Sequence, residues 1–294
     1  MDRTLQVIAM LKESAHSSRG DMPETLIFLH VPKTAGISVS QTIIPHFPAA
    51  ETYHVRSPDH AKAPVFSENH GTIDDFKRLP EIERSRYRCI LGHMHFGLHE
   101  HVPGPSAYVA LLRDPVDRLL SHFGQYCRMV ENDEFGDDAV LPSLEEFCRE
   151  KPRAMDNHQI RFLCGWNFDD HPRQESLDRA KENLRRWFRV VGTVERFDET
   201  VGVLHRVYGW PEVARFRENV GTDRLHRKDV DPGFLAEITE LNWLDRELHA
   251  LADSLLDVAI AEHRESPSGA AGSHGGPRRP FFLRRALDRV LRRT

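Results

Sequence analysis

The chain has 294 residues, of which 39% are hydrophobic, and a formal net charge of −5. This length and composition suffice for a full hydrophobic core within one domain. Residues 278–294 hold seven arginines and one aspartate, a charge of +6, so the rest of the chain carries −11. An acidic body argues against binding nucleic acid through a broad basic face, and any anion site must be a local cluster of cations.

The N-terminal residues and the cysteines indicate the cell compartment of the protein. Residues 1–24 combine a short helical pattern with a polar linker, and their apolar stretch is too short for a signal peptide or membrane anchor. Cys89, Cys127, Cys148 and Cys164 form no C-x-x-C pair, which is typical of reduced thiols in a cytosolic protein. We therefore expect a cytoplasmic protein.

Residues 25–44, TLIFLHVPKTAGISVSQTII, contain the most informative local pattern. Thr25 to Val31 is an apolar run that predicts a strand buried on both faces of a parallel sheet. A small-residue turn follows, and then apolar residues at helical spacing. A strand, turn and helix start in this order direct backbone N–H groups at one point, where an anion such as phosphate binds. Because Lys33 precedes Gly36, the order argues against a Walker A loop, in which lysine follows the glycines.

The remaining chain alternates strands with helices in the same way. Further strands are predicted at 88–91, 107–112 and 189–194. Helices are predicted to begin after Thr72 and Ser143, each of which opens a capping box, and also at 115–130, 154–164, 175–187, 198–208 and 232–263. Residues 45–70 have no period and are interpreted as one long surface loop. This pattern predicts a three-layer α/β fold with a central parallel sheet, like that of P-loop NTPases.

Three polar features follow predicted strands directly. They are the turn that contains Lys33, the pair Gly92-His93, and Arg113. Ligands of open parallel sheets bind beyond the carboxyl ends of the strands, so we expect all three to meet at one crevice. Asp114 and Pro115 supply an N-cap and the first residue of the helix that follows Arg113.

Several segments together resemble one enzyme family. The string HVPKTAGIS (30–38) resembles the 5′-phosphosulfate loop of sulfotransferases that use 3′-phosphoadenosine 5′-phosphosulfate (PAPS), and SAYVALLRDPVDRLLSHF (106–123) resembles their 3′-phosphate-binding segment. GHMHFGLHEH (92–101), DNHQIRFLCG (156–165) and VVGTVERFDET (190–200) match as well. From about Thr25 to about Glu262 the chain therefore resembles heparan sulfate 2-O-sulfotransferase and its bacterial relatives.

This resemblance implies a donor, an acceptor and a set of site residues. PAPS would be the donor, and a hydroxyl, on a glycan in the closest relatives, would be the acceptor. Lys33 would support the leaving phosphate, and His93 would deprotonate the acceptor hydroxyl. The implied donor-binding residues are Lys33, Thr34, Ala35, Gly36, Ile37, Ser38, Arg113, Ser121 and Arg224. Ile37 departs from the family, because many relatives have threonine there.

Several alternatives remain open. His95 competes with His93 for the role of base, and Arg227 competes with Arg224 for the phosphates. The alternating histidines at 93–101 also suggest zinc, but no Cys or Asp lies at a matching spacing, so no metal is expected. A kinase-like phosphotransferase would need a Walker loop and acidic metal ligands. A non-catalytic nucleotide-binding protein would bind the nucleotide without turnover.

Three more residues have predicted surroundings. Asn157 and Arg161 are separated by one helical turn, so they are predicted to point to the same side. Arg118 is expected to be a solvated helix residue, as charged side chains usually are.

The chain is thus divided into residues 1–24, a sulfotransferase domain at 25–264, a flexible linker at 265–277 and a basic tail at 278–294. On a helix, the apolar residues of the tail would form one stripe and its arginines the rest. The tail is either disordered or an interfacial helix that docks on anionic lipid at the inner face of the membrane. Sedimentation with anionic liposomes, before and after deletion of 278–294, distinguishes the two.

Overall fold

The computed structural model describes residues 24–57, 65–134, 140–165, 172–211 and 225–264. Within these residues, six strands form one sheet in the order β3-β2-β4-β1-β5-β6, and every neighbouring pair is parallel. The strands are β1 (Thr25–Leu29), β2 (Thr52–Val55), β3 (His70–Gly71), β4 (Cys89–Gly92), β5 (Ser106–Leu112) and β6 (Phe188–Thr193). The predicted α/β fold with a central parallel sheet is therefore confirmed.

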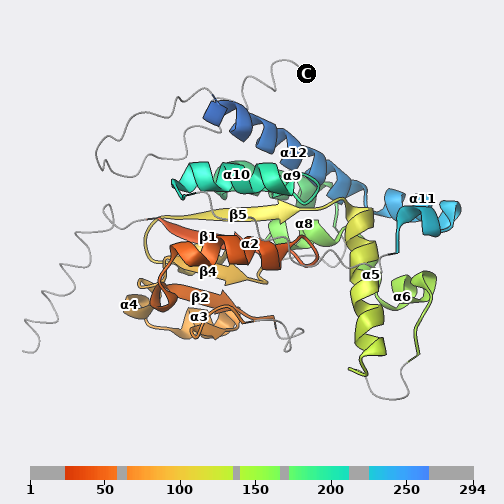
Figure 1. Ribbon diagram of the computed structural model, residues 1–294, viewed down its shortest axis with the longest axis horizontal. Helices are drawn as coiled ribbons and strands as arrows, with labels where there is room; N and C mark the ends of the chain where they lie inside the picture. Colours follow the sequence, from red (N-terminus) through yellow and green to blue (C-terminus); the bar gives the residue numbers. More distant parts are fainter. Residues whose placement is uncertain (1–23, 58–64, 135–139, 166–171, 212–224, 265–294) are drawn as a thin grey trace, which may run out of the picture.

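Helices lie on both faces of this sheet and beyond its carboxyl edge. Their bounds are α2 (Gly36–Ile43), α3 (Ile73–Arg78), α4 (Glu81–Arg84), α5 (Pro115–Glu131), α6 (Leu144–Glu150), α7 (Pro152–Met155), α8 (His158–Leu163), α9 (Gln174–Trp187), α10 (Phe197–Tyr208), α11 (Pro232–Leu241) and α12 (Trp243–Arg264). The described residues also contain the short 3₁₀ turns η1 (Ile44–His46), η2 (Ala49–Glu51), η4 (Leu98–His101) and η5 (Arg227–Asp229). Figure 1 shows α5 lying across the end of the sheet toward which the strands point.

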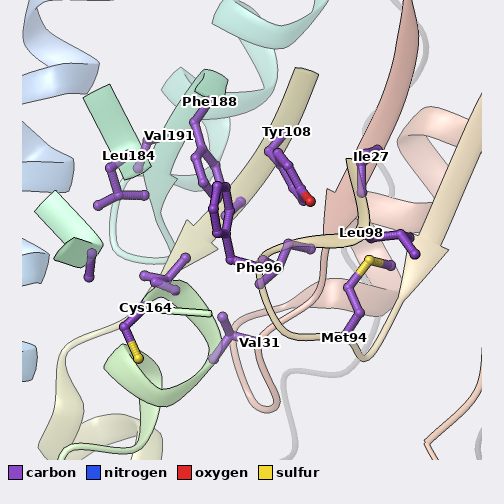
Figure 2. Close-up of a cluster of buried hydrophobic side chains, with 14 of the residues drawn as sticks. Ile27, Val31, Met94, Phe96, Leu98, Tyr108, Cys164, Leu184, Phe188 and Val191 are labelled. Carbon is purple, nitrogen blue, oxygen red and sulfur yellow. The ribbon is translucent and has the colours of Figure 1, made fainter. Parts of the chain in front are cut away.

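The strand β1 is buried on both faces, as its apolar sequence predicts. Ile27 and Leu29 belong to a core cluster shared with α8, α9 and α12. Leu26 and Phe28, which point to the opposite face, belong to a second cluster shared with α2 and α10. Figure 2 shows the first cluster, with side chains from the sheet, the segment after β4 and helix α9 gathered around Phe96. Burial on both faces explains why β1 has no polar alternation.

A third apolar cluster holds α5 in place. Leu119 and Leu120 of α5 pack with Phe147 of α6 and Ile238 of α11. Because one side of α5 is packed in this way, its other side is left for the polar residues that face the end of the sheet. The predicted caps are also present: Thr72 and Ser143 form capping boxes, and the Asp114 carboxylate accepts the first N–H groups of α5.

The predicted loop at 45–70 is wrong in part. It contains η1, η2 and the short strands β2 and β3, which extend the sheet beyond β4. All four residues of β2 are buried, and each pairs with a residue of β4. Four residues between polar turns are too few to show a hydrophobic period in the sequence. β2 is a strand because it pairs with β4 in the folded protein.

Two predicted long helices are each broken. The helix predicted at 154–164 is divided into α7 and α8, because Asn157 adopts a left-handed backbone with φ of 42°. The helix predicted at 232–263 is divided into α11 and α12 at Asn242, whose buried side chain bonds back to Met155 and Ile238. The helix expected to begin at Asp198 begins at Phe197.

Some predicted features lie outside the described residues. They are the N-terminal helix within 1–23, most of the loop with Arg224, the linker, and the amphipathic tail, and they stay predictions. In the part of the chain that the structure describes, no helix has both the length and the apolar character needed to cross a membrane.

An ion pair ties α12 to the segment that follows β6. His249 Nε2 donates to Glu195 Oε2 at 3.0 Å, and Asp253 lies 3.8 Å from Nδ1. Burial by itself would lower the pKa of His249, but the hydrogen bond and charge of Glu195 outweigh it and raise this pKa above its ordinary value. Protonated His249 therefore favours the folded state below its ordinary pKa of 6.5, and this contribution is lost as the pH rises through the raised value.

We predict that His249→Gln lowers the free energy of unfolding by about 1 kcal/mol near pH 5.5 and by less near about pH 8.5. Urea unfolding at the two pH values measures the difference. Lys181→Gln removes the neighbouring ion pair to Glu247, which contains no histidine, and serves as the control. An equal effect of His249→Gln at both pH values would contradict the assigned role.

Candidate functional site

The three strand ends singled out from the sequence lie side by side. β1 pairs with β4 on one side and with β5 on the other. The residues that follow these strands are His30 after β1, His93 after β4, and Arg113 after β5. The sheet order therefore brings the Lys33 turn, His93 and Arg113 to one edge, as predicted.

The turn between β1 and α2 has the geometry of an anion-binding loop. Lys33 and Ala35 adopt left-handed backbones, with φ of 72° and 58°. Between them, the buried Thr34 donates its hydroxyl proton to Val31 O at 2.8 Å. Successive turns of this kind direct N–H groups into one concavity, and the first turn of α2 contains no acidic residue. The loop therefore suits a phosphate or sulfate group.

A pocket of about 330 Å³ lies at the start of α5, and one of its residues, Arg113, contacts this loop. It is lined by Arg113, Asp117, Leu120, Ser121, Leu225, His226, Arg227 and Lys228. Arg113 and Ser121, predicted as one phosphate site, thus share one wall. Lys228 and His226 were missed, because nothing in the sequence places the segment after Leu225 against α5. Arg224 itself lies outside the described residues.

Contacts join the loop to α5 and to the end of β5. Arg113 Nη1 donates to Lys33 O at 3.3 Å, and Lys33 Nζ donates to Gln125 Oε1 at 3.1 Å. Gln125 follows Ser121 by one helical turn, so both lie on the same side of α5. The two segments that are predicted to bind phosphate are therefore in direct contact.

A buried glutamine fixes the backbone of Arg113. Gln159 accepts from Arg113 N at 2.9 Å and donates Nε2 to Arg113 O at 2.7 Å. Its own backbone N–H and that of Ile160 donate to the Asp245 carboxylate, both at 2.8 Å. Burial raises the pKa of Asp245 to about 6, against the effect of these two donors. Gln159 lies in the motif DNHQIRFLCG, but nothing in the sequence indicates this role.

The other polar residues of this region have structural partners. Asn157 Nδ2 donates to Asp156 Oδ1 at 2.6 Å and Arg161 Nη2 donates to Asp156 Oδ2 at 3.3 Å, so the two side chains meet at one carboxylate. Asn157 Oδ1 also accepts from Asp245 N at 3.0 Å. Arg118 is fully buried and donates to Ala154 O, so the expected solvated position is wrong. Burial lowers the pKa of Arg118 to about 10.

The position of His93 depends on the glycine that precedes it. Gly92 has φ of 134°, and a Cβ at this position would lie 2.1 Å from Val55 O, so only glycine fits. His93 Nδ1 lies 3.0 Å from His30 O. Because a carbonyl oxygen only accepts, Nδ1 carries the proton in this contact and Nε2 retains its lone pair in the neutral ring. An unprotonated Nε2 is suited to accept a proton.

The competing histidines have different surroundings. His95 Nδ1 lies 2.9 Å from Arg161 O, the ring stacks on Phe162, and burial lowers the pKa of His95. His99 packs between Tyr108 and Trp187 in the first core cluster. In the described ranges, no group of three or more His, Cys, Asp or Glu side chains is arranged to hold a metal ion.

An anion-binding turn between a parallel strand and a helix, with a basic pocket beside it, defines a P-loop-like α/β protein. The family model for galactose-3-O-sulfotransferase matches residues 7–256, and the chain belongs to this sulfotransferase family. The predicted resemblance to sulfotransferases is therefore confirmed.

Curated relatives are similar at low identity. Human uronyl 2-sulfotransferase is 24% identical over 151 residues, which cover 46% of this chain and 37% of the relative. Heparan-sulfate 6-O-sulfotransferase 2 from Gallus gallus is 28% identical over 177 residues, which cover 50% of this chain and 43% of the relative. The matched regions thus span less than half of each relative.

We predict that Gln159→Leu lowers the free energy of unfolding by about 2 kcal/mol, because it leaves the Arg113 N–H and C=O without these bonds. Gln174→Leu is the matched control, since Gln174 bonds only at an exposed position of α9. Its effect should stay within about 0.5 kcal/mol. Urea unfolding of both variants measures this, and equal effects would contradict the role of Gln159.

Proposed function

We propose that the protein transfers the sulfuryl group of PAPS to a hydroxyl group of a carbohydrate. The observation that carries this proposal is the joined site, in which Arg113 of the pocket bonds to the backbone of Lys33 in the anion loop. A nucleotide with phosphates at both ends of its ribose requires two anion sites at a short separation. Family membership supports the same reaction.

The donor would span the loop and the pocket. The N–H groups of residues 34–38 and Lys33 would hold the 5′-phosphosulfate, and the Ser38 hydroxyl lies in the same segment. The Thr34 hydroxyl donates to Val31 O and supports the loop instead. Arg113 and Ser121 would hold the 3′-phosphate, since a guanidinium can bind phosphate through two donors. Lys228 adds positive charge to the pocket wall, where Asp117 forms an ion pair with Arg227.

The reaction would be an in-line transfer without a covalent intermediate on the protein. The acceptor oxygen attacks sulfur while the bond from sulfur to the 5′-phosphate oxygen breaks. His93 Nε2 takes the hydroxyl proton, and Lys33 neutralises charge on the leaving phosphate. The products are a sulfate ester and adenosine 3′,5′-bisphosphate.

A glycan is the proposed acceptor because the similar proteins are named for galactose, uronyl and heparan-sulfate sulfation. The proposed location is the cytoplasm, with the tail at 278–294 in contact with the inner face of the membrane. Both stay predictions, as does the absence of a metal from the reaction.

We predict that calorimetry detects binding of adenosine 3′,5′-bisphosphate and that Arg113→Ala weakens it about 30-fold or more, since a charged donor to phosphate is lost. The same substitution should change the affinity for adenosine 5′-monophosphate, which lacks the 3′-phosphate, much less. Arg246→Ala removes an exposed arginine of α12 and is the matched control. Equal losses for the two nucleotides would contradict the assignment of Arg113 to the 3′-phosphate.

With labelled PAPS and a panel of glycans, we expect sulfate transfer that His93→Ala lowers by about 100-fold or more, because the general base is lost. The affinity for adenosine 3′,5′-bisphosphate should be kept, which serves as the internal control. Nucleotide binding without transfer to any acceptor would favour the non-catalytic alternative. Phosphate transfer from ATP would favour the kinase-like one.

A further inference from the structure

We propose that His30 is a positioning residue that joins the donor loop to His93, and this proposal rests on the proposed function. His30 follows β1 directly and begins the turn that contains Lys33. Its backbone and its side chain both contact the residues that are assigned to the reaction. Nothing in the sequence distinguishes it from an ordinary residue of the turn.

The backbone of His30 continues the pairing of β1 with β4. His30 N donates to Gly92 O at 3.0 Å, and His30 O lies 3.0 Å from His93 Nδ1. The first bond holds the two strand ends in register. The second fixes the proton of His93 on Nδ1, and it also stabilises the imidazolium that forms when Nε2 takes a proton.

The side chain of His30 stacks directly on the ring of His93. Their ring centroids lie 4.2 Å apart with an interplanar angle of 27°. On β1, the ring of Phe28 is nearly parallel to that of His30, at 5.7 Å and 9°. Because the His30 ring is held by its contact with Phe28, the His93 ring that stacks on it has less freedom to rotate. The direction of His93 Nε2 is therefore restricted.

The same imidazole fills the space in front of Gly36. A Cβ on Gly36 would lie 1.8 Å from His30 Nε2 and 1.9 Å from Cδ2. Gly36 is the first residue of α2, a conformation that any L-residue adopts. Glycine is therefore needed at position 36 because of the His30 ring. This ring touches the start of the donor-binding helix on one side and His93 on the other.

These contacts define what His30 does. It fixes the separation between the helix start that would bind the phosphosulfate and the imidazole that would take the acceptor proton. In-line transfer depends on the alignment of the two reacting oxygens, and small displacements lower the rate strongly. His30 acts through His93 and the loop, without itself taking the proton.

The test is a double-mutant cycle on positions 30 and 36. Gly36→Ala should weaken binding of adenosine 3′,5′-bisphosphate by about tenfold or more, because the new methyl group displaces the loop or the ring. Adding His30→Ala removes the obstacle and should restore the affinity to within about threefold of His30→Ala alone. No rescue in the double variant would overturn the proposed contact.

The kinetic test separates positioning from binding. His30→Ala should lower kcat by about tenfold or more with little change in the KM for PAPS, because His93 is less restrained. His30→Phe, which retains a ring but no proton acceptor, should recover part of kcat. An unchanged kcat in His30→Ala overturns the proposal. A kcat of His30→Phe no higher than that of His30→Ala also overturns it and favours direct proton transfer by His30.

A third readout does not depend on turnover. The ¹⁵N chemical shifts of His93 should show the proton on Nδ1 in the wild-type protein. His30→Ala keeps the backbone oxygen but removes the stacked ring that restrains His93, so it should increase the share of the other tautomer. If the wild-type protein binds no adenosine 3′,5′-bisphosphate, the proposed function fails. The His93 tautomer and the rescue of Gly36→Ala in urea unfolding would still decide whether His30 holds the two elements.

Discussion

The position of β1 between β4 and β5 is the constraint on which the rest of the site depends. Because the three strands are parallel and adjacent, the turns that follow them leave the sheet at the same edge. The anion loop, His93 and Arg113 thus come together although 80 residues separate Lys33 from Arg113. The two apolar clusters that bury β1 on both faces keep this edge in place.

A second support reaches the site from α12. The buried Asp245 accepts the first N–H groups of α8, and Gln159 of the same helix holds both backbone polar groups of Arg113. The charge of the fully buried Arg118 lies close enough to favour the ionised form of Asp245. A buried charge that lost its partner would be costly. The position of Arg113 is therefore fixed by groups that are themselves fully buried.

The start of α5 carries two acidic residues next to the proposed anion site. Asp114 caps the helix and, with Asp117, pairs with Arg227 of η5. These pairs offset one of the two negative charges and bring the segment after Leu225 against α5, where it lines the pocket. The same contacts thus build one wall of the pocket and reduce the unfavourable charge there.

The sequence by itself predicts the parallel α/β sheet, the anion loop and the convergence of Lys33, His93 and Arg113, because continuous apolar strands and strand-end polar residues are local patterns. It also predicts the caps at Thr72, Ser143 and Asp114. The strands β2 and β3 are too short to show a period. The breaks at Asn157 and Asn242 depend on side-chain bonds between helices that are far apart in the chain. Only the tertiary structure shows Gln159 behind Arg113, Arg118 inside the protein and the His30 ring between Gly36 and His93. Each of these depends on which surfaces meet after folding, and no local pattern specifies that.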